Sequence, residues 1–317
     1  MFNTIKTFIA VAVISVICIP TGIILGGCTN NKKADIVVTI FPQYDWVMNI
    51  LGDNPGGLRV TYLLSRGVDL HSYQPSINDL STIGNAKLFI YVGGESDDKW
   101  VKSAINKNGK AIALMDQVAT IITEHDEDDP DHDCDDHGDL HEDEHVWLSI
   151  KNARALVRVI ANEIGKIDPN NKDTYTKNSD DYRAELWELH TKYVIEMSAA
   201  VAKGKDTVVI ADRNPFLYLF EDYGFTGIAA FDGCSAETSI TDKMQDKLIK
   251  AVNDLGLDYV LYIDNYSVAN YIRNKSNATK LGQMQDGQQV NNNQIKKGVT
   301  YLSIMADNLA VLKLVLG

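Results

Sequence analysis

Cysteine and positive charge are both scarce in this chain. Only four of its 317 residues are cysteine, and two of them, Cys18 and Cys28, lie close to the N-terminus. The other two, Cys134 and Cys234, are too few for a disulfide framework, and the sequence leaves open whether they pair. The 30 basic residues are outnumbered by 43 acidic ones and form no stripe with interleaved aromatics, which excludes a nucleic-acid-binding surface.

One segment, residues 124–145, contains no lysine or arginine at all. Its 22 residues hold 13 carboxylates, five of the seven histidines and one cysteine. Because so many negative charges repel one another and cannot form a hydrophobic core, we expect this segment to be solvated. We call it the acidic histidine loop. A segment that needs only negative charge has no use for histidine, so the histidines need another explanation. Imidazole, carboxylate and thiolate groups together are the ligands that zinc prefers. The accessory metal ligands expected in this loop are His125, His132, His137 and His141.

The first 28 residues are predicted to be an export signal. One lysine, Lys6, precedes an almost uncharged apolar run that ends in two glycines and Cys28. Small residues directly before a cysteine resemble a bacterial lipobox, in which the signal is removed and the cysteine becomes a lipidated N-terminus. A retained transmembrane anchor is the alternative, although Pro20 and Gly22 interrupt the run. Either outcome attaches the remainder to the outer face of the cytoplasmic membrane.

Strand-like apolar runs alternate with helical patterns along the rest of the chain. These runs are 36–41, 58–64, 87–94 and 111–115, then 207–212, 226–231 and 258–264. The alternation predicts an α/β fold with parallel sheets flanked by helices. Between the two sets, one helical pattern begins after Ser149, whose hydroxyl suits an N-cap, and a second covers 172–201.

This order predicts two lobes joined by a long backbone helix, with a binding site between the lobes. Ahead of the N-terminal lobe comes the export segment. The predicted divisions are 1–28 for the export segment, 29–170 for the N-terminal lobe with the acidic histidine loop, 171–204 for the connecting helix and 205–317 for the C-terminal lobe.

Seven segments, in the same order along the chain, match the pattern of one known family. They are VVTIFPQYDWV (37–47), GVDLHSYQPSINDL (67–80), KLFIYVGGES (87–96), DEHVWLSIKNA (143–153), VVIADRNPFLYLFEDYGF (208–225), FDGCSAETS (231–239) and GVTYLSIMADNLAVL (298–312). The chain thereby resembles the metal-binding lipoproteins of zinc and manganese ABC importers, the ZnuA/TroA-like solute-binding family. The resemblance implies a non-enzymatic receptor that captures a divalent metal outside the membrane and presents it to a permease and its ATPase.

By the same resemblance, His71 and His145 are the metal ligands of the N-terminal lobe. Both histidines follow predicted strands, at the end of a parallel sheet where ligands usually bind. An imidazole can offer one nitrogen to a metal while a neighbouring acceptor orients the other. The residues and the resemblance therefore agree on these two ligands.

The C-terminal lobe departs from the family pattern. Arg213 stands where many relatives have histidine or glutamate, and residues 285–288 replace a late segment with two histidines. Guanidinium has no acceptor and cannot coordinate a metal, so we expect Arg213 to pair with Asp212 or Glu237 or to hold an anion. Asp286 is the best remaining candidate for a third ligand. The lesser candidates are Asp212, Cys234 and Glu237.

The sequence leaves the metal and two other functions open. The histidines and the thiol favour zinc over manganese. His141-Glu142-Asp143-Glu144-His145 formally satisfies the HExxH pattern of zinc metalloproteases, but that motif must lie on a helix, and these repelling acids make a poor helix. A calcium-binding or adhesive surface lipoprotein is the other alternative, although calcium gives no reason for so many histidines.

Overall fold

The structure, a computed structural model, describes residues 34–105, 110–124, 141–231 and 240–317, without the side chains of Glu124 and His141. Several predicted positions lie outside the described residues: Cys28, His125, His132, Cys134, His137, Cys234 and Glu237. Among the described residues, none of the helices is both long enough and apolar enough to cross a membrane.

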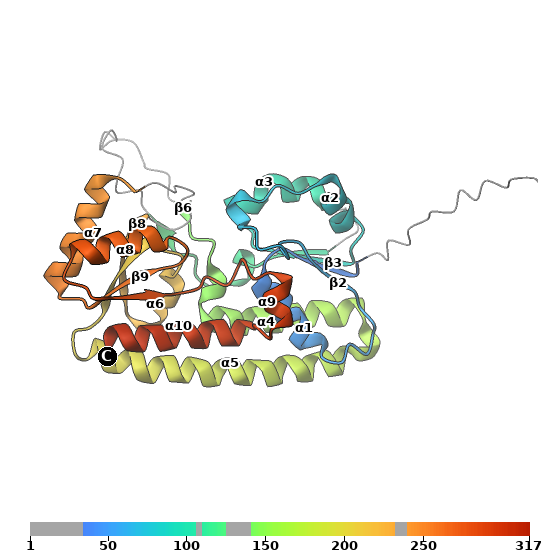
Figure 1. Ribbon diagram of the computed structural model, residues 1–317. Helices are drawn as coiled ribbons and strands as arrows, with labels where there is room; N and C mark the ends of the chain where they lie inside the picture. Colours follow the sequence, from blue (N-terminus) through green and yellow to red (C-terminus); the bar gives the residue numbers. More distant parts are fainter. Residues whose placement is uncertain (1–33, 106–109, 125–140, 232–239) are drawn as a thin grey trace, which may run out of the picture. The chain divides into compact units, whose positions relative to one another are not determined.

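Two four-stranded parallel sheets form the two lobes (Figure 1). The first has the order β2-β1-β3-β4, and the second has the order β10-β9-β7-β8. The strands of the first sheet are β1 (Ile36–Val38), β2 (Val60–Tyr62), β3 (Leu88–Tyr91) and β4 (Lys110–Ala113). Those of the second are β7 (Thr207–Arg213), β8 (Thr226–Phe231), β9 (Tyr259–Tyr262) and β10 (Lys280–Gln283).

The central strand of the first sheet is buried on both faces. Ile36 pairs with Val60 on one side and with Leu88 on the other, and all three residues of β1 are inaccessible to solvent. A parallel sheet needs crossover helices that cover its faces, which is why its strands are continuously apolar rather than alternating. The helices of this lobe are α1 (Phe41–Leu51), α2 (Ile77–Gly84) and α3 (Glu95–Ala104), with 3-10 turns η1 (Leu70–Ser72) and η2 (Met115–Gln117).

Hydroxyl caps set where two predicted helices begin. The Ser149 hydroxyl accepts the backbone N–H of Asn152 at the start of α4 (Ile150–Ile167). The Ser76 hydroxyl accepts the backbone N–H of Asp79 at the start of α2, and the Asp79 carboxylate accepts the backbone N–H of Ser76, which completes a capping box. Each cap satisfies N–H groups that have no partner within the helix, and the helix start predicted at Ser149 is confirmed.

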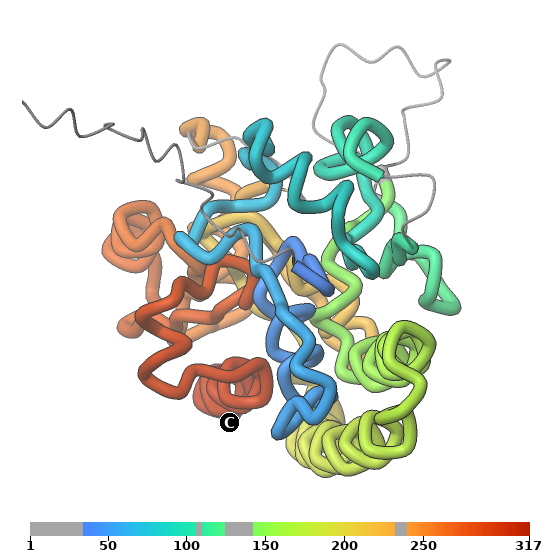
Figure 2. The backbone as a smooth tube through the Cα atoms, turned by 90° about the vertical axis from the view of Figure 1, so that its right-hand side faces the viewer, coloured from blue at the N-terminus to red at the C-terminus, as the bar shows by residue number. Residues whose placement is uncertain are grey.

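A layer of long helices underlies both sheets. The 30-residue helix α5 (Lys172–Val201) follows α4 after the 3-10 turn η4 (Pro169–Asn171), and the C-terminal helix α10 (Tyr301–Leu316) lies along it (Figure 1). Figure 2 views these helices nearly along their axes, with α1 between α10 and α4. The predicted architecture, two parallel-sheet lobes with a long backbone helix, is confirmed.

The second lobe contains more elements than the sequence predicted. The helices α6 (Leu217–Tyr223), α7 (Asp242–Leu255) and α10 match the predicted pattern. In this lobe the sequence analysis missed α8 (Tyr266–Lys275), β10 and α9 (Asn292–Lys296), and in the first lobe it missed α3. Each of these elements is short and has few apolar residues, so little of a repeating pattern is available in the sequence.

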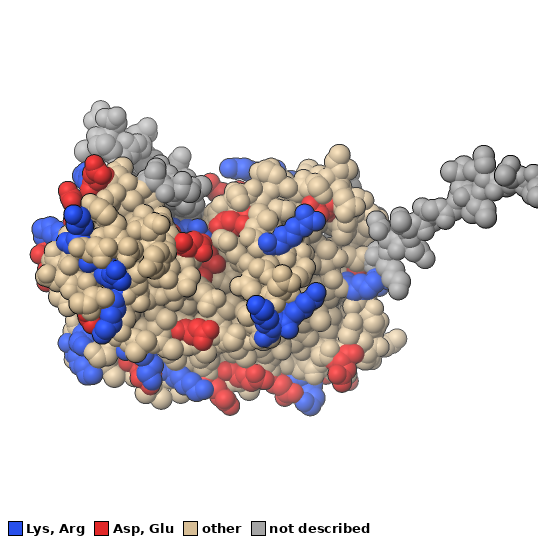
Figure 3. All heavy atoms as spheres, in the orientation of Figure 1, with Lys and Arg blue, Asp and Glu red and all other residues tan. Residues whose placement is uncertain are grey.

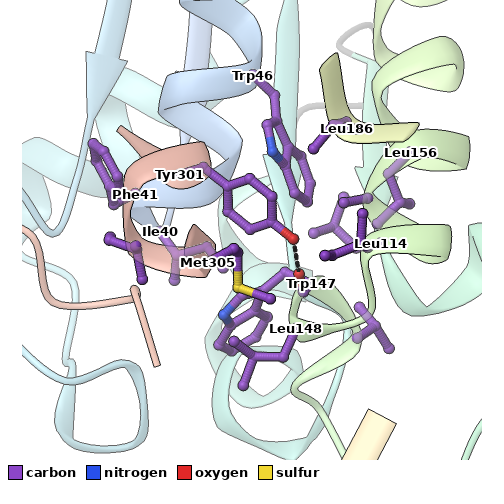
Figure 4. Close-up of a cluster of buried hydrophobic side chains, with 14 of the residues drawn as sticks. Ile40, Phe41, Trp46, Leu114, Trp147, Leu148, Leu156, Leu186, Tyr301 and Met305 are labelled. Carbon is purple, nitrogen blue, oxygen red and sulfur yellow. Dashed lines mark hydrogen bonds between the residues drawn. The ribbon is translucent and has the colours of Figure 1, made fainter. Parts of the chain in front are cut away.

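A buried aromatic cluster joins the N-terminal sheet to the helix layer (Figure 4). Trp46 of α1 packs edge-to-face on Tyr301 of α10, with ring centres 5.3 Å apart. The Tyr301 hydroxyl donates to the carbonyl oxygen of Trp147, 2.7 Å away, as drawn in Figure 4. Tyr193 of α5 donates to the carbonyl of Met305 at 2.6 Å. The cluster thereby fixes the backbone at Trp147, two residues after a predicted metal ligand.

Charges are dispersed over the face shown in Figure 3. Lysine and arginine side chains alternate there with acidic ones, and the described part of this face carries no continuous basic stripe. Non-specific binding to a nucleic-acid backbone depends on such a stripe.

Candidate metal centre

His71 lies in the turn that follows the first sheet's edge strand β2. Asp69 caps the 3-10 turn η1 by accepting the backbone N–H of His71, and the same Oδ1 lies 2.7 Å from the Nδ1 atom of the ring. A carboxylate can only accept at this contact, so Nδ1 carries the proton and Nε2 is the nitrogen that can coordinate a metal. The side chains of His71 and Asp69 are 12% and 22% exposed.

His145 repeats this arrangement at a second place in the fold. Asp143 Oδ1 accepts the backbone N–H of His145 at 2.9 Å and lies 2.6 Å from its Nδ1. Both side chains are fully buried. His145 directly precedes the 3-10 turn η3 (Val146–Leu148), whose three residues are buried and whose Trp147 belongs to the aromatic cluster. The core therefore fixes the backbone on the C-terminal side of this histidine.

The two histidine rings face each other. Their centres are 5.6 Å apart and their planes are inclined at 33°. Two imidazoles on one zinc ion, with Zn–N bonds of about 2.0–2.1 Å, place their ring centres roughly 5 Å apart. Aspartates hold both rings by Nδ1, as the outer partners of metal-binding histidines do. The donor set of His71 and His145 therefore fits a borderline divalent metal.

Arg213, at the end of β7, links carboxylates of both lobes. Its Nη2 atom lies 2.8 Å from Asp286 Oδ2, 3.2 Å from Asp69 Oδ2 and 3.7 Å from Asp264 Oδ2. Burial acts to lower the pKa of the guanidinium, but the neighbouring charges of Asp286, Asp69 and Asp264 outweigh it and raise the pKa. Arg213 is therefore a permanent positive charge within this acidic group.

The predicted partner of Arg213 needs correction. The structure pairs Arg213 with carboxylates other than Asp212, although the two are neighbours in sequence. Asp212 Oδ2 instead accepts the backbone N–H groups of the turn after β9, from Ile263, Asp264 and Asn265, at 2.8–3.2 Å. Its Oδ1 accepts the backbone N–H of Arg213 at 3.0 Å, so the carboxylate of Asp212 binds backbone groups and not the guanidinium.

Asp286 lies at the same junction, but its carboxylate binds protein groups. Oδ2 accepts from Arg213 and, at 3.1 Å, from Gln288 Nε2, while Oδ1 accepts the backbone N–H of Gln288. Its backbone carbonyl accepts from Trp147 Nε1 at 2.8 Å. Across the described residues, no three histidine, cysteine, aspartate or glutamate side chains are arranged to hold a metal together. The role of Asp286 as a third ligand stays a prediction.

The loop that carries His71 is connected to the other lobe by several bonds. Gln288 Oε1 accepts the backbone N–H of Leu70 at 3.2 Å, and Gln289 Nε2 donates to Asp69 Oδ2 at 2.9 Å. Burial acts to raise the pKa of Asp69, but the hydrogen bond from His71 and the charges of His71 and Arg213 lower it to about 2. Asp69 therefore stays ionised at any physiological pH, and it orients His71 throughout that range.

The HExxH segment is not helical. His141 and Glu142 form β6, which pairs antiparallel with β5 (Thr123–Glu124), and Thr123 lies opposite Glu142. In a strand, residues four apart do not share one helical face, so the geometry of a zincin motif is absent from this segment. The metalloprotease alternative is therefore not favoured.

Sequence reasoning missed the residues that orient the ligands. Asp69 and Asp143 each stand two positions before a predicted ligand, so both ligands belong to an Asp-x-His pattern. This Asp-x-His spacing, repeated at both ligands, could have identified the two orienting aspartates from the sequence. Gln288 and Tyr218, which connect the site loops to the C-terminal lobe, carry no such signal because their partners are backbone groups distant in sequence.

The comparisons with known proteins point to the same kind of site. Residues 36–314 match the model of the ZnuA family, described as the periplasmic component A of a zinc-uptake complex. The chain belongs to the ZnuA family. This membership confirms the family that the sequence segments predicted.

Individual ZnuA-family relatives agree with this membership. The zinc-uptake protein ZnuA of Bacillus subtilis is 30% identical over 292 residues, which are 90% of this chain and 88% of that protein. The zinc-binding lipoprotein AdcA of Streptococcus pneumoniae R6 is 29% identical over 91% of this chain, but the match spans only 58% of AdcA. The Zn(II)-bound ZnuA-like domain of pneumococcal AdcA superposes with a TM-score of 0.69 at 25% identity, over 90% of this chain and 99% of that domain.

Proposed function

We propose that this protein captures zinc outside the cytoplasmic membrane and delivers it to the permease of an ABC importer. Zinc would bind between the two lobes, to Nε2 of His71 and Nε2 of His145, with Asp286 as the third ligand. The observation that carries the proposal is the pair of aspartate-oriented imidazoles whose ring centres lie 5.6 Å apart.

The donor set favours zinc but leaves room for manganese. Two imidazoles suit zinc better than the harder manganese ion, whereas a carboxylate third ligand shifts the preference towards manganese. Zinc appears in the names of the relatives, and a Mn-bound periplasmic protein from Candidatus Liberibacter asiaticus shares the fold at 20% identity and a TM-score of 0.70. We therefore infer zinc as the principal cargo, with a modest preference over manganese.

Membrane attachment and delivery belong to the same proposal. Lipidation at Cys28 would tether the protein beside the permease, and the acidic histidine loop would collect zinc at low supply and pass it to His145. We propose the division of the chain from the sequence pattern alone. It consists of the export segment (1–28), the N-terminal lobe (29–170), the connecting helix (171–204) and the C-terminal lobe (205–317). The calcium-binding or adhesive alternative is not favoured, since the paired imidazoles are nitrogen ligands and calcium prefers oxygen.

Alanine substitution of each histidine tests the proposed site. His71→Ala and His145→Ala should each weaken zinc binding by about tenfold or more, a loss seen even for residues behind the ligands. Competition titration against a chromophoric zinc chelator measures this affinity. His190→Gln is the matched control, since His190 is buried on α5 and its Nδ1 contacts the Tyr223 hydroxyl. Unchanged zinc affinity in both alanine variants would overturn the proposed site.

A further inference from the structure

Arg213 places a permanent positive charge beside the carboxylates that the cargo would need. Its Nη2 atom contacts Asp286 at 2.8 Å and Asp69 at 3.2 Å, and Asp69 in turn holds the His71 ring at 2.7 Å. One carboxylate therefore separates the guanidinium from a proposed zinc ligand. Arg213 is mostly buried, with a side chain 16% exposed, so solvent screens its charge poorly.

Arg213 and a metal ion would have to share the negative charge of the Asp286 carboxylate. Its side chain is only 6% exposed, and Oδ2 already accepts charge-assisted bonds from Arg213. A buried carboxylate needs a cation or strong donors, and here the guanidinium fills that role. Zinc on Asp286 would bring the divalent ion next to a like charge that no physiological pH removes, and the ion would draw the negative charge of the carboxylate away from Arg213.

We infer that Arg213 is an internal cation that competes with zinc for Asp286, so that it lowers zinc affinity and accelerates zinc release. The inference rests on the proposed function, because it concerns the same site. Zinc binding weakens the Arg213–Asp286 ion pair in favour of a zinc–carboxylate bond, and release restores the pair. A receptor of this kind must release zinc to the permease. Competition from Arg213 offsets part of the free energy of zinc binding and leaves the two histidines unchanged.

A purely structural role for Arg213 makes the opposite prediction. Arg213 connects Asp69 of one lobe to Asp286 of the other, so a structural link would preorganise the site. Removing such a link would loosen the lobes and weaken zinc binding. Removing a competitor strengthens binding instead. The sign of the change in affinity therefore separates the two roles.

Neutralising Arg213 is the direct experiment. Arg213→Gln keeps hydrogen-bond donors for the buried carboxylates but removes the charge, and Arg213→Lys keeps the charge as the matched control. Zinc affinity comes from chelator competition, and the dissociation rate from a stopped-flow chelator chase. We expect R213Q to bind zinc about tenfold more tightly with correspondingly slower release, and R213K to stay within about threefold of wild type. In an Asp286→Asn background the gain from R213Q should vanish.

A second variant covers the case in which R213Q does not fold. Arg213→Ala in millimolar methylguanidinium restores a guanidinium at the site, and zinc should bind that variant more weakly as methylguanidinium rises, while equal concentrations of urea change nothing. Equal or weaker zinc affinity in folded R213Q, or no effect of methylguanidinium on R213A, would overturn the inference. Failure of the proposed function looks different, because the wild-type protein itself would then not bind zinc.

Discussion

The hydroxyl of Tyr218 donates a hydrogen bond to the backbone carbonyl of Asp143, 3.0 Å away. The same hydroxyl accepts the backbone N–H of Ile122 at 3.0 Å, and the Asp143 N–H donates to the Ile122 carbonyl. Ile122 and Asp143 flank the paired strands β5 and β6, and Asp143 belongs to the C-terminal end of the acidic histidine loop. Because Tyr218 lies on α6, one side chain of the C-terminal lobe holds the base of this loop and the backbone beside His145.

Tyr218→Phe should therefore weaken the proposed site without changing its ligands. The substitution leaves a partly buried N–H and a buried carbonyl without their partner, at a cost of about 1–3 kcal/mol in stability. We expect zinc affinity at the His145 site to fall several-fold, because Asp143 would orient the ring less well. Chelator competition on the folded variant measures the affinity, and thermal unfolding measures the stability. A stability loss with wild-type zinc affinity would limit Tyr218 to a structural role.

Substitution of the two orienting aspartates should have unequal effects. Asp143 and His145 are fully buried, so no water can replace the lost acceptor in Asp143→Ala. Asp69 is 22% exposed and His71 12%, so water can partly replace Asp69 in Asp69→Ala. We expect losses of zinc affinity of about 10- to 100-fold, larger for D143A. Asp180→Ala, at an exposed side chain on α5, is the control; equal effects of D69A and D143A would contradict this ranking.

The sequence predicted the architecture well because the strands and long helices carry strong patterns. The continuous apolar strand at 36–38 and the helix over 172–201 each match their predicted type. The caps at Ser76 and Ser149 were also predictable, because capping depends on residues only a few positions apart. Local chemistry of this kind is visible in one sequence without an alignment.

The contacts of Arg213 and Asp286 were not predictable in the same way. Arg213 was expected to have a carboxylate partner, but its partners lie 144, 51 and 73 residues away in sequence, at Asp69, Asp264 and Asp286. Such pairs form where loops from different strands converge at the ends of the sheets, and no periodicity encodes them. The neighbour Asp212 was the obvious local choice, but backbone N–H groups of the turn at 263–265 bind its carboxylate.

Removing residues 126–140 should distinguish zinc ions bound by the acidic histidine loop from the zinc ion bound by His71 and His145. This deletion leaves Ile122, Asp143 and the Tyr218 contacts in place, whereas a deletion extending to Asp143 would remove the acceptor that orients His145. Long solvated segments tolerate excision, so we expect wild-type stability. The number of bound zinc ions should fall while the tightest affinity stays unchanged, as measured by calorimetric titration. Wild-type stoichiometry in the shortened protein would show that the loop is only a spacer.

A buried carboxyl group away from the site should make stability depend on pH. Asp45 of α1 is 7% exposed, and its Oδ2 accepts from the Tyr182 hydroxyl at 3.0 Å. Burial raises its pKa from 3.8 to about 6, although the hydrogen bonds from Tyr182 and from the Tyr301 backbone oppose the increase. The pKa in the folded state therefore lies above that in the unfolded state, so folding favours the protonated form.

The contribution of Asp45 to stability is then fully present below about pH 4 and is lost as the pH rises through about 6. Asp45→Asn removes this titration and keeps an oxygen acceptor for Tyr182, so its unfolding free energy should lack this component. Between pH 4 and pH 7 wild type should lose stability relative to D45N by on the order of 3 kcal/mol at most. Urea unfolding of both proteins at intervals across this range measures the difference, with Asp180→Asn as the exposed control. Parallel pH profiles for wild type and D45N would show that Asp45 titrates alike in the folded and unfolded chains.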